Sequence, residues 1–231
     1  MWERAEPAIR SAPGPLSRQA IVSAAIALAD QDGLAAVSLR KVGALLGAGP
    51  MRLYGYLSTK EELLELMVDA AYGEMVWSAP AEADWRSAVR AIAHRMRQVS
   101  RAHPWLIELL GGRVHIGPHA LAHLEASLSA LTATPGFEDI DVALRALRTV
   151  NAYVIGAIRN ESSELRAERE TGLDKSAWQS VNYQYIERML ATGRFPNLAR
   201  VVRDASHPAG EVLFDEGLEC VLDGIEALLA R

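Results

Sequence analysis

This chain of 231 residues contains one cysteine, Cys220, and few aromatic residues, which make up 6% of the sequence. A single cysteine excludes an intramolecular disulfide and a cysteine-based zinc site. Long hydrophobic runs are missing as well. The longest uncharged stretch, 126–137, contains Pro135 and Gly136 and is shorter than the ~20 apolar residues that span a bilayer. The N-terminus lacks the apolar run of a signal peptide. We therefore expect a cytoplasmic protein without a membrane segment.

Recognisable catalytic motifs are also missing. The sequence has no glycine-rich phosphate loop after a strand and no G-x-S-x-G motif, and Cys220 lies within a predicted helix without a neighbouring base. Acidic pairs such as Asp139 and Asp141 are two residues apart and point to different sides of a helix. The sequence therefore predicts neither an enzyme nor a cofactor.

What the sequence does contain is helical periodicity. Apolar residues recur at spacings of three and four, and no stretch alternates with period two, so we predict an all-α fold. N-cap residues and glycine stops divide the first part of the chain into helices. The expected helices are 17–33, 38–47, 50–57, one that starts at Thr59, 85–101, 104–110, 120–131, 139–168, 175–192 and 211–229, with 193–210 mostly loop.

Charge divides the chain into two parts. The net charge is −5, yet residues 1–60 hold seven basic and four acidic side chains, and the remainder holds 17 basic and 25 acidic ones. A basic front on an acidic body suits a protein whose front meets phosphates. We expect a flexible arm at 1–15, a helix-turn-helix DNA-binding domain at 16–67, and a larger helical ligand-binding and dimerisation domain at 68–231.

The front combines two short helices, a Gly-containing turn and a supporting helix, as in the unit whose second helix enters the major groove. Leu53 and Leu57 are expected to face inward. An arginine can pair with guanine, a methionine can contact a thymine methyl, and tyrosine and lysine can bind phosphates. The predicted DNA-binding residues are Arg40, Met51, Arg52, Tyr54, Gly55, Tyr56 and Lys60. The alternative is an ordinary corner of a helical bundle, with these charges solvated.

A family resemblance favours the first interpretation. It rests on Leu16, Ser17, Arg18, Ile21, Ala24, Ala25, Leu28, Gly33, the run 37–42, Leu46, Gly47, Leu53, Tyr54, Lys60, Leu63 and Leu64. This pattern resembles the DNA-binding domain of the tetracycline-repressor (TetR) family. Trp85, the run 114–117, Leu124, Glu125, and 143–156 more loosely resemble that family's regulatory core. The resemblance implies a ligand-responsive, DNA-binding transcriptional repressor. Arg52, Gly55 and Tyr56 depart from the pattern of tetracycline-binding members, so the operator sequence should differ.

One recognition helix reads few base pairs, so specific binding needs a dimer on pseudo-palindromic operator DNA. The last helix has apolar residues at alternating spacings of four and three, and the long helix carries a second apolar stripe. Each stripe alone is more often intramolecular core. Together they match the two helices through which the resembled family forms homodimers. The predicted interface residues are Leu147, Val154, Gly156, Ile158, Phe214, Leu218, Val221 and Ile225.

The middle helices are expected to enclose a cavity for a small, largely apolar effector of unknown identity. Apolar walls with a few isolated polar groups are typical of such sites. The predicted lining is Ile92, Met96, Trp105, Leu106, His115, Ser127 and Asn151. The resemblance places His115 at a magnesium-binding position, but Ile92 replaces a drug-contacting asparagine, so tetracycline is not expected.

His115, His119 and His123 also suggest a metal site. Gly117 and Pro118 separate His115 from the other two, and no carboxylate lies in register, so we predict no metal. Two alternatives to the regulator remain. One is a DNA-binding protein with a vestigial pocket that a partner protein controls. The other is a helical enzyme or interaction bundle that does not bind DNA.

Overall fold

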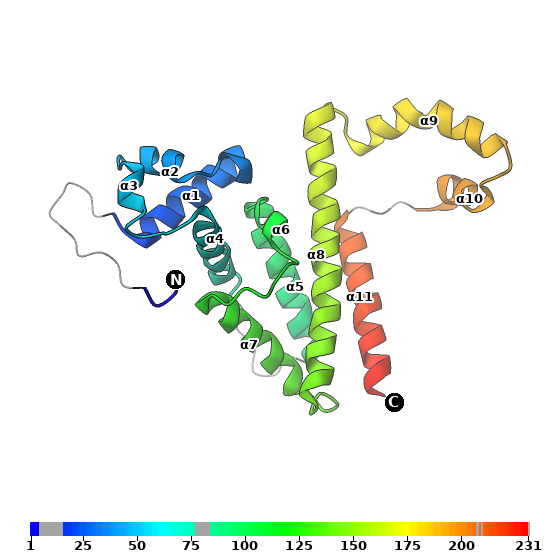
Figure 1. Cartoon of the computed structure of the whole chain (residues 1–231). Coiled ribbons are helices and arrows are strands. Elements are labelled where there is room, and N and C mark those ends of the chain that lie inside the picture. The colour runs from blue at the N-terminus through cyan, green and yellow to red at the C-terminus, as the bar shows by residue number, and fades with distance from the viewer. Residues whose placement is uncertain (5–15, 77–83, 207, 209, 231) are drawn as a thin grey trace.

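The computed structural model describes residues 1–4, 16–76, 84–206, 208 and 210–230, and over these residues the fold is all-α, as predicted (Figure 1). No strand occurs in the described ranges. The helices are α1 (Arg18–Asp32), a short 3-10 turn η1 (Leu34–Ala36), α2 (Leu39–Leu45), α3 (Pro50–Leu53), α4 (Lys60–Glu74), α5 (Trp85–Ala102), α6 (Leu106–Leu109), α7 (Pro118–Thr132), α8 (Ile140–Thr171), α9 (Lys175–Ala191), α10 (Pro196–Asp204) and α11 (Gly210–Leu229).

Local signals set the boundaries of the first helices. The hydroxyls of Ser17, Ser38 and Thr59 each accept a hydrogen bond from a backbone N–H three residues later, at 3.0, 3.3 and 3.1 Å. These are the predicted N-caps. Gly33 ends α1 at a φ of 81°, a value that side-chain-bearing residues rarely adopt. The sequence-predicted starts of α1, α2 and α4 are therefore confirmed.

Two predicted segments differ in the structure. The third helix ends at Leu53 instead of continuing to Leu57, and a turn follows it. The predicted loop 193–210 contains α10, which begins with Pro196 at its first position. Proline suits that position, because its missing N–H would have no partner within the helix. The prolines of 193–210 favoured a loop in the sequence analysis, but Pro196 is the first residue of a helix.

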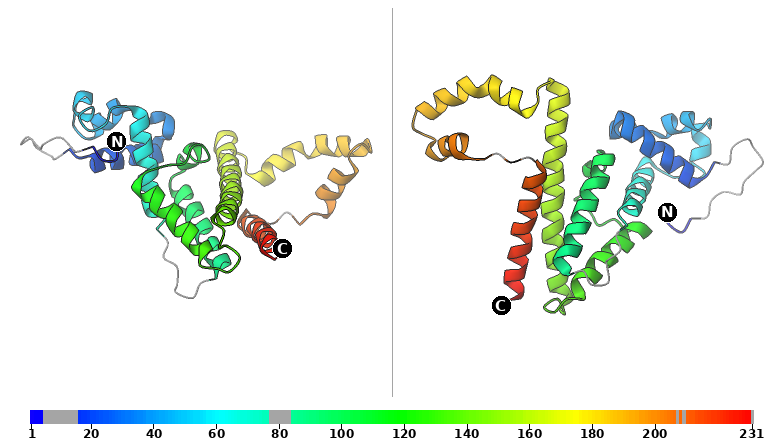
Figure 2. Two further views of the ribbon diagram at one scale, coloured as in Figure 1. Left: turned by 60° about the horizontal axis from the view of Figure 1, so that its bottom comes forward. Right: turned by 180° about the vertical axis from the view of Figure 1, so that it is seen from behind.

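The molecule has a small front and a longer body joined by α4 (Figure 1). Helices α1, α2 and α3 form the front, and α4 packs against α1 on one side and α7 on the other. In the body α8 packs against α5, α7 and α11. Both views of Figure 2 show α8 and α11 side by side. One continuous apolar core runs from Ile21 in α1 to Ile225 in α11, so the front is packed onto the body through α4.

Two segments lie at the margins of this core. Helices α9 and α10 form an arm that projects from the end of α8, and α9 contains no buried residue (Figures 1 and 2). At the other margin the first four residues rest against the start of α4, where Arg4 Nη1 donates to Ser58 Oγ at 3.0 Å and pairs with Glu62. This part of the predicted flexible arm is thus docked, and residues 5–15 lie outside the described ranges, as does most of the predicted linker after Trp77.

None of the described helices combines the length and the apolarity needed to cross a membrane.

Candidate functional site

The corner between α2 and α3 is tightly packed at Gly43. The Gly43 carbonyl accepts a hydrogen bond of 2.8 Å from the N–H of Ala48. A Cβ atom at Gly43 would lie 2.6 Å from the Ala48 carbonyl oxygen, closer than real Cβ atoms approach. Gly47 turns the chain at a φ of 61°. These two glycines let α3 fold back against α2, which gives the compact corner of a helix-turn-helix unit.

The outer face of this corner is exposed and basic. Met51 is 80% exposed and Tyr54 51%, while Leu53 and Leu57 are fully buried beneath them. The side chains of Arg40, Arg52 and Lys60 are also exposed, and over the described residues none of them forms an ion pair or a side-chain hydrogen bond. Cations without a partner on one face remain available for the phosphates and base edges of DNA.

Tyr56 differs from the sequence expectation. It was expected on the outer face, but its side chain is buried with Leu53 and Leu57. The prediction was wrong because α3 ends at Leu53: the following turn rotates residue 56 inward, where a continuous helix would have placed it outside. Gly55 is exposed, as expected. The outer face therefore consists of Arg40, Met51, Arg52, Tyr54, Gly55 and Lys60.

A polar junction connects this front to the body. Asp30 Oδ1, at the end of α1, accepts a hydrogen bond of 2.7 Å from Trp105 Nε1 and lies 2.8 Å from His103 Nδ1. The other ring nitrogen of His103 lies 3.2 Å from Glu74 Oε2 in α4. Burial lowers the pKa of His103, but the two carboxylates outweigh burial and raise the pKa above its usual 6.5. The His103 ring thus bridges a carboxylate of α1 and a carboxylate of α4.

A second link joins α4 to α7 of the body. Asp69, a buried residue of α4, accepts hydrogen bonds from the backbone N–H groups of His119 and Ala120, both at 3.0 Å. Its other oxygen lies 2.9 Å from His119 Nδ1. A carboxylate at a helix N-terminus is favourable for both the free N–H groups and the helix dipole. Helix α7 is thereby fixed to α4.

Two small adjoining cavities lie between α4, α5, α7 and α8. One, of about 90 Å³, is lined by Tyr72, Val76, His119 and His123, and the other, of about 10 Å³, by Met96 and Asn151. Ile92 and Ser127 line both. Burial lowers the pKa of His123, which favours a neutral ring at this wall. The lining is apolar with a few polar groups, the composition of a small-molecule site.

The structure brings together four of the seven predicted lining residues: Ile92, Met96, Ser127 and Asn151. The other three lie elsewhere. Trp105 faces a separate crevice, Leu106 is fully buried, and His115 lies 3.1 Å from Glu65 and packs against the ring of Tyr72. Sequence reasoning missed Tyr72, His119 and His123 as lining residues, although the one-turn spacing of the two histidines indicated a shared face. The described residues contain no cluster arranged to hold a metal ion.

The predicted dimer seam lies mostly inside the subunit. Six of its members are buried in the core that α8 forms with α5, α7 and α11 of the same chain, so the seam interpretation needs correction. These residues are Leu147, Val154, Ile158, Phe214, Leu218 and Ile225. Val221 is half-buried against the same core, and Gly156 is exposed. Apolar residues at such spacings bury against any neighbouring helix, and here that neighbour belongs to the same subunit.

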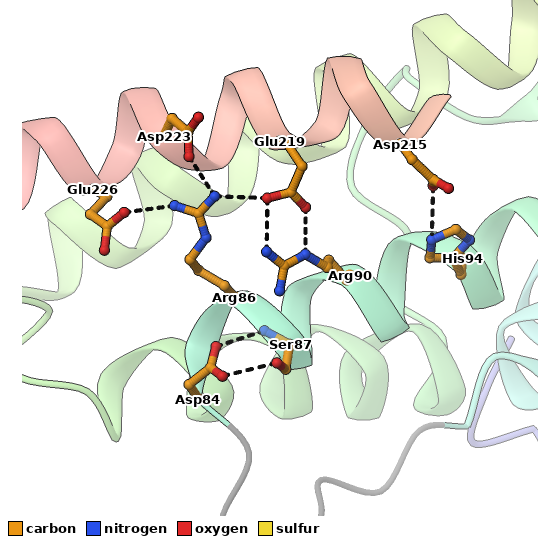
Figure 3. A network of polar contacts seen from close by, with 9 residues as sticks. All are labelled: Asp84, Arg86, Ser87, Arg90, His94, Asp215, Glu219, Asp223 and Glu226. Atoms are coloured by element: carbon orange, nitrogen blue, oxygen red, sulfur yellow. Dashed lines mark hydrogen bonds and ion pairs between the residues drawn. The ribbon is translucent and has the colours of Figure 1, made fainter. Parts of the chain in front are cut away.

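Helix α11 is also joined to α5 by ion pairs (Figure 3). Arg86 lies 2.8 Å from Glu219 and 2.7 Å from Glu226, and it also pairs with Asp223. Arg90 pairs with Glu219, and His94 Nε2 lies 3.0 Å from Asp215. Hydrogen bonds from Arg90 and Arg86 lower the pKa of Glu219 to about 2. One flank of α11 is therefore occupied by α5.

Comparison with known proteins identifies the family. The model for the tetracyclin repressor-like C-terminal domain matches residues 78–229, and the model for bacterial regulatory proteins of the tetR family matches residues 21–67. The chain belongs to the TetR family of transcriptional regulators. Its relatives include the HTH-type transcriptional repressor DrrR1 of Streptomyces coeruleorubidus, 34% identical over 100% of this chain and 85% of that protein. An HTH-type transcriptional regulator of Saccharopolyspora erythraea is 33% identical over 98% of this chain and 91% of its own length.

Solved structures of TetR proteins share the whole fold. Apo ActR of Streptomyces coelicolor superposes with a TM-score of 0.80 at 25% identity, over 95% of this chain and 99% of ActR. ActR in complex with actinorhodin gives the same TM-score over 94% of this chain. DrrR1 is thus a transcriptional repressor, and ActR is a TetR family protein that binds actinorhodin. The chain is therefore a TetR regulator with a helix-turn-helix domain, and not an enzyme.

Proposed function

We propose that the protein is a homodimeric repressor that acts in the cytoplasm, binds pseudo-palindromic operator DNA, and releases it when a small, largely apolar effector enters the body. The exposed face of α2 and α3, with its unpaired cations, is the observation on which the proposal depends. We assign DNA binding to residues 16–67, and effector binding and dimerisation to 68–231.

The DNA-binding face supports two kinds of contact. Arg52 and Met51 lie on α3, where they would meet base edges if the helix entered the major groove. Lys60 begins α4 and Arg40 lies at the start of α2, so both flank α3 and would meet phosphates. Arg52 is therefore the proposed reader of sequence, and Lys60 a positioning contact.

Dimerisation would use the faces of α8 and α11 that the subunit leaves exposed. On α11 the exposed residues of this face are Leu213, Cys220, Gly224 and Leu228. On α8 the small residues Thr149, Ala152 and Gly156 are exposed. A hollow of about 680 Å³ beside Ala152, Gly156 and Leu213 separates the two rows. Small residues allow close backbone approach, so the same rows on a second copy would fit this surface.

The arm supports the same arrangement. Trp178, Val181 and Tyr185 of α9 are 55%, 70% and 56% exposed, and α9 packs against α10. Exposed aromatic residues on a helix without a core are typical of a protein–protein contact. A second subunit beside α8 and α11 is the proposed partner for this helix.

The effector would enter by displacing α7. The two cavities are far smaller than the roughly 300–1,000 Å³ of typical ligand sites, so an effector must open them. Because Asp69 holds the start of α7 to α4, movement of α7 would pull α4 and, through it, the front. By linkage, an effector that weakens operator binding must bind the operator complex more weakly by the same factor.

Selection of genomic DNA fragments with the purified full-length protein tests DNA binding and supplies the operator. Arg52→Ala should then cost roughly 1–3 kcal/mol and relax the preference at one base pair of each half-site. Lys60→Ala should weaken binding to all sequences alike and reduce the salt dependence. Arg200→Ala is the matched control, since Arg200 is exposed on α10, away from the corner. Unchanged affinity and base preference in Arg52→Ala would contradict the assigned face.

Operator titrations with and without compounds that bind the purified protein test the effector step. Some compounds should bind the unmodified protein but not the Asn151→Leu variant, because Asn151 is a polar group of the cavity lining. These compounds should lower the operator affinity of the unmodified protein. Compounds that bind at Asn151 and leave operator affinity unchanged would favour the alternative of a vestigial pocket controlled by a partner protein.

A further inference from the structure

A larger crevice lies between the front and the body. It has a volume of about 700 Å³ and is bounded by the C-terminal end of α1, the end of α5, α6 and the outer half of α8. Figure 1 shows the end of α1 next to α6, facing α8. The crevice shares no lining residue with the two cavities at Ile92. Its volume lies in the range of sites that hold drug-sized molecules.

The walls of the crevice carry opposite charges. On the α1 side lie Asp30 and Asp32, at the negative end of the helix dipole. On the α8 side lie Arg166 and Arg169, and also Glu161, whose carboxylate is paired with Arg97 and Arg101. Arg166 is 3.6 Å from Glu108, and both of these side chains are largely exposed. In the described part of the chain, Asp32 and Arg169 form no ion pair. One charge of each sign is therefore free on the two walls.

The floor between these walls is apolar and contains an unsatisfied hydroxyl. Trp105 and Ile158 are 2% and 1% exposed. Ser100, which also lines the crevice, is 1% exposed, and its hydroxyl has no hydrogen-bond partner in the described structure. A buried hydroxyl without a partner is costly, and a polar atom of a bound molecule would supply the missing partner.

We propose that this crevice is a second ligand site, which binds an amphoteric organic molecule. Its cationic group lies toward Asp32 and the end of α1, its acidic group lies toward Arg166 and Arg169, and its apolar part covers Trp105 and Ile158. A molecule seated there touches the DNA-binding domain on one side and the body on the other. The site is separate from the proposed effector cavity and does not depend on it.

Three dyes with one ring system but different charges test the proposal on the full-length protein. Rhodamine B carries a cation and a carboxylate, its methyl ester carries only the cation, and fluorescein carries only negative charge. Fluorescence polarisation should show that rhodamine B binds about tenfold more tightly than either of the others, a difference of about 1.4 kcal/mol.

Charge reversals on the two walls locate the binding. Arg169→Glu and Asp32→Lys should each weaken rhodamine B binding about tenfold, whereas binding of the methyl ester should weaken only in Asp32→Lys. Arg148→Glu is the matched control, because Arg148 is an exposed arginine of α8 outside the crevice, and it should leave rhodamine B binding unchanged. All three positions are exposed, and circular dichroism verifies the fold of each variant.

Three results would overturn the proposal. They are equal affinities for rhodamine B and its methyl ester, rhodamine B binding that survives Arg169→Glu, and no rhodamine B binding up to about 1 mM. Loss of rhodamine B binding in Asn151→Leu, with binding retained in Arg169→Glu, would place the dye in the effector cavity instead.

Discussion

Gly43 shows how one residue sets the shape of the DNA-binding corner. A methyl group at this position meets the Ala48 carbonyl oxygen at 2.6 Å, and that oxygen belongs to the backbone, which cannot rotate away. Gly43→Ala should therefore lower the free energy of unfolding by about 1–3 kcal/mol, the usual cost of overpacking. Urea denaturation followed by circular dichroism measures the change.

Gly49→Ala is the control for this change. Gly49 lies in the same turn region, but a Cβ there has no neighbour within 4 Å and its φ of −65° suits any residue. The free energy of unfolding of the Gly49→Ala variant should change by no more than about 0.5 kcal/mol. Equal stabilities of the Gly43→Ala and Gly49→Ala variants would show that the backbone around Gly43 shifts to accommodate a methyl group.

At this scale the sequence predicted what is decided locally. Ser17, Ser38 and Thr59 cap helices because a hydroxyl needs only the next turn of backbone, so each was recognisable from its neighbours. The place of Tyr56 depends on where α3 ends, and that depends on packing of the turn against the front. His119 and His123 line a cavity because α7 crosses α4 and α5, an arrangement that no local spacing specifies.

At the scale of elements, the ion pairs of Figure 3 predict acid sensitivity of the α5–α11 contact. Hydrogen bonds from Arg90 and Arg86 lower the pKa of Glu219 from 4.5 to about 2. A lowered carboxyl pKa stabilises the folded state above its ordinary pKa, and the contribution is lost as pH falls from 4.5 toward 2. Since Glu219 is 39% exposed, solvent screening limits the contribution of its ion pairs to stability to about 1 kcal/mol.

Glu219→Gln should therefore be less stable than the unmodified protein at neutral pH. The gap should narrow as the pH falls below about 4.5, where the native carboxyl also becomes neutral. Thermal denaturation of both proteins between neutral pH and about pH 2 measures this difference in stability. Glu216→Gln is the control, because Glu216 is exposed on α11 and forms no ion pair in the described structure. A gap that stays constant down to pH 2 would contradict the assigned pairing.

The same helices show the limit of periodicity. The stripes on α8 and α11 predicted a dimer seam, whereas in the structure these two helices pack against each other within the subunit. The spacing could not show which surface they cover, because a core within a subunit and an interface between subunits bury the same residue types. The exposed faces of the two helices, with Gly156 on α8 and Gly224 on α11, could be identified only after the buried faces were known.

At the scale of the whole molecule, the proposed dimer can be tested without harming the subunit. Gly224 lies on the exposed face of α11, and a Cβ there meets nothing within 4 Å. Gly224→Glu should leave the subunit folded and place an unpaired charge in the dimer interface, which costs several kcal/mol. Analytical ultracentrifugation at micromolar concentration should show monomers, and operator affinity should fall with dimerisation.

Gly112→Glu adds the same charge in the loop between α6 and α7, where a Cβ also meets nothing within 4 Å. It should sediment like the unmodified protein. If the Gly224→Glu protein remains a dimer with an unchanged dimerisation affinity, the exposed face of α11 is not the dimer interface.

The exposed arm also affects how long a lone subunit would survive. Helix α9 contributes no buried residue, so its unfolding costs less than that of any helix in the core, and a protease needs only such local opening. A subunit without a partner would be cut first between Lys175 and Asp204, whereas a partner that covers the arm would protect it. Turnover would then remove unassembled chains selectively and keep the pool of repressor in the form that reads both half-sites.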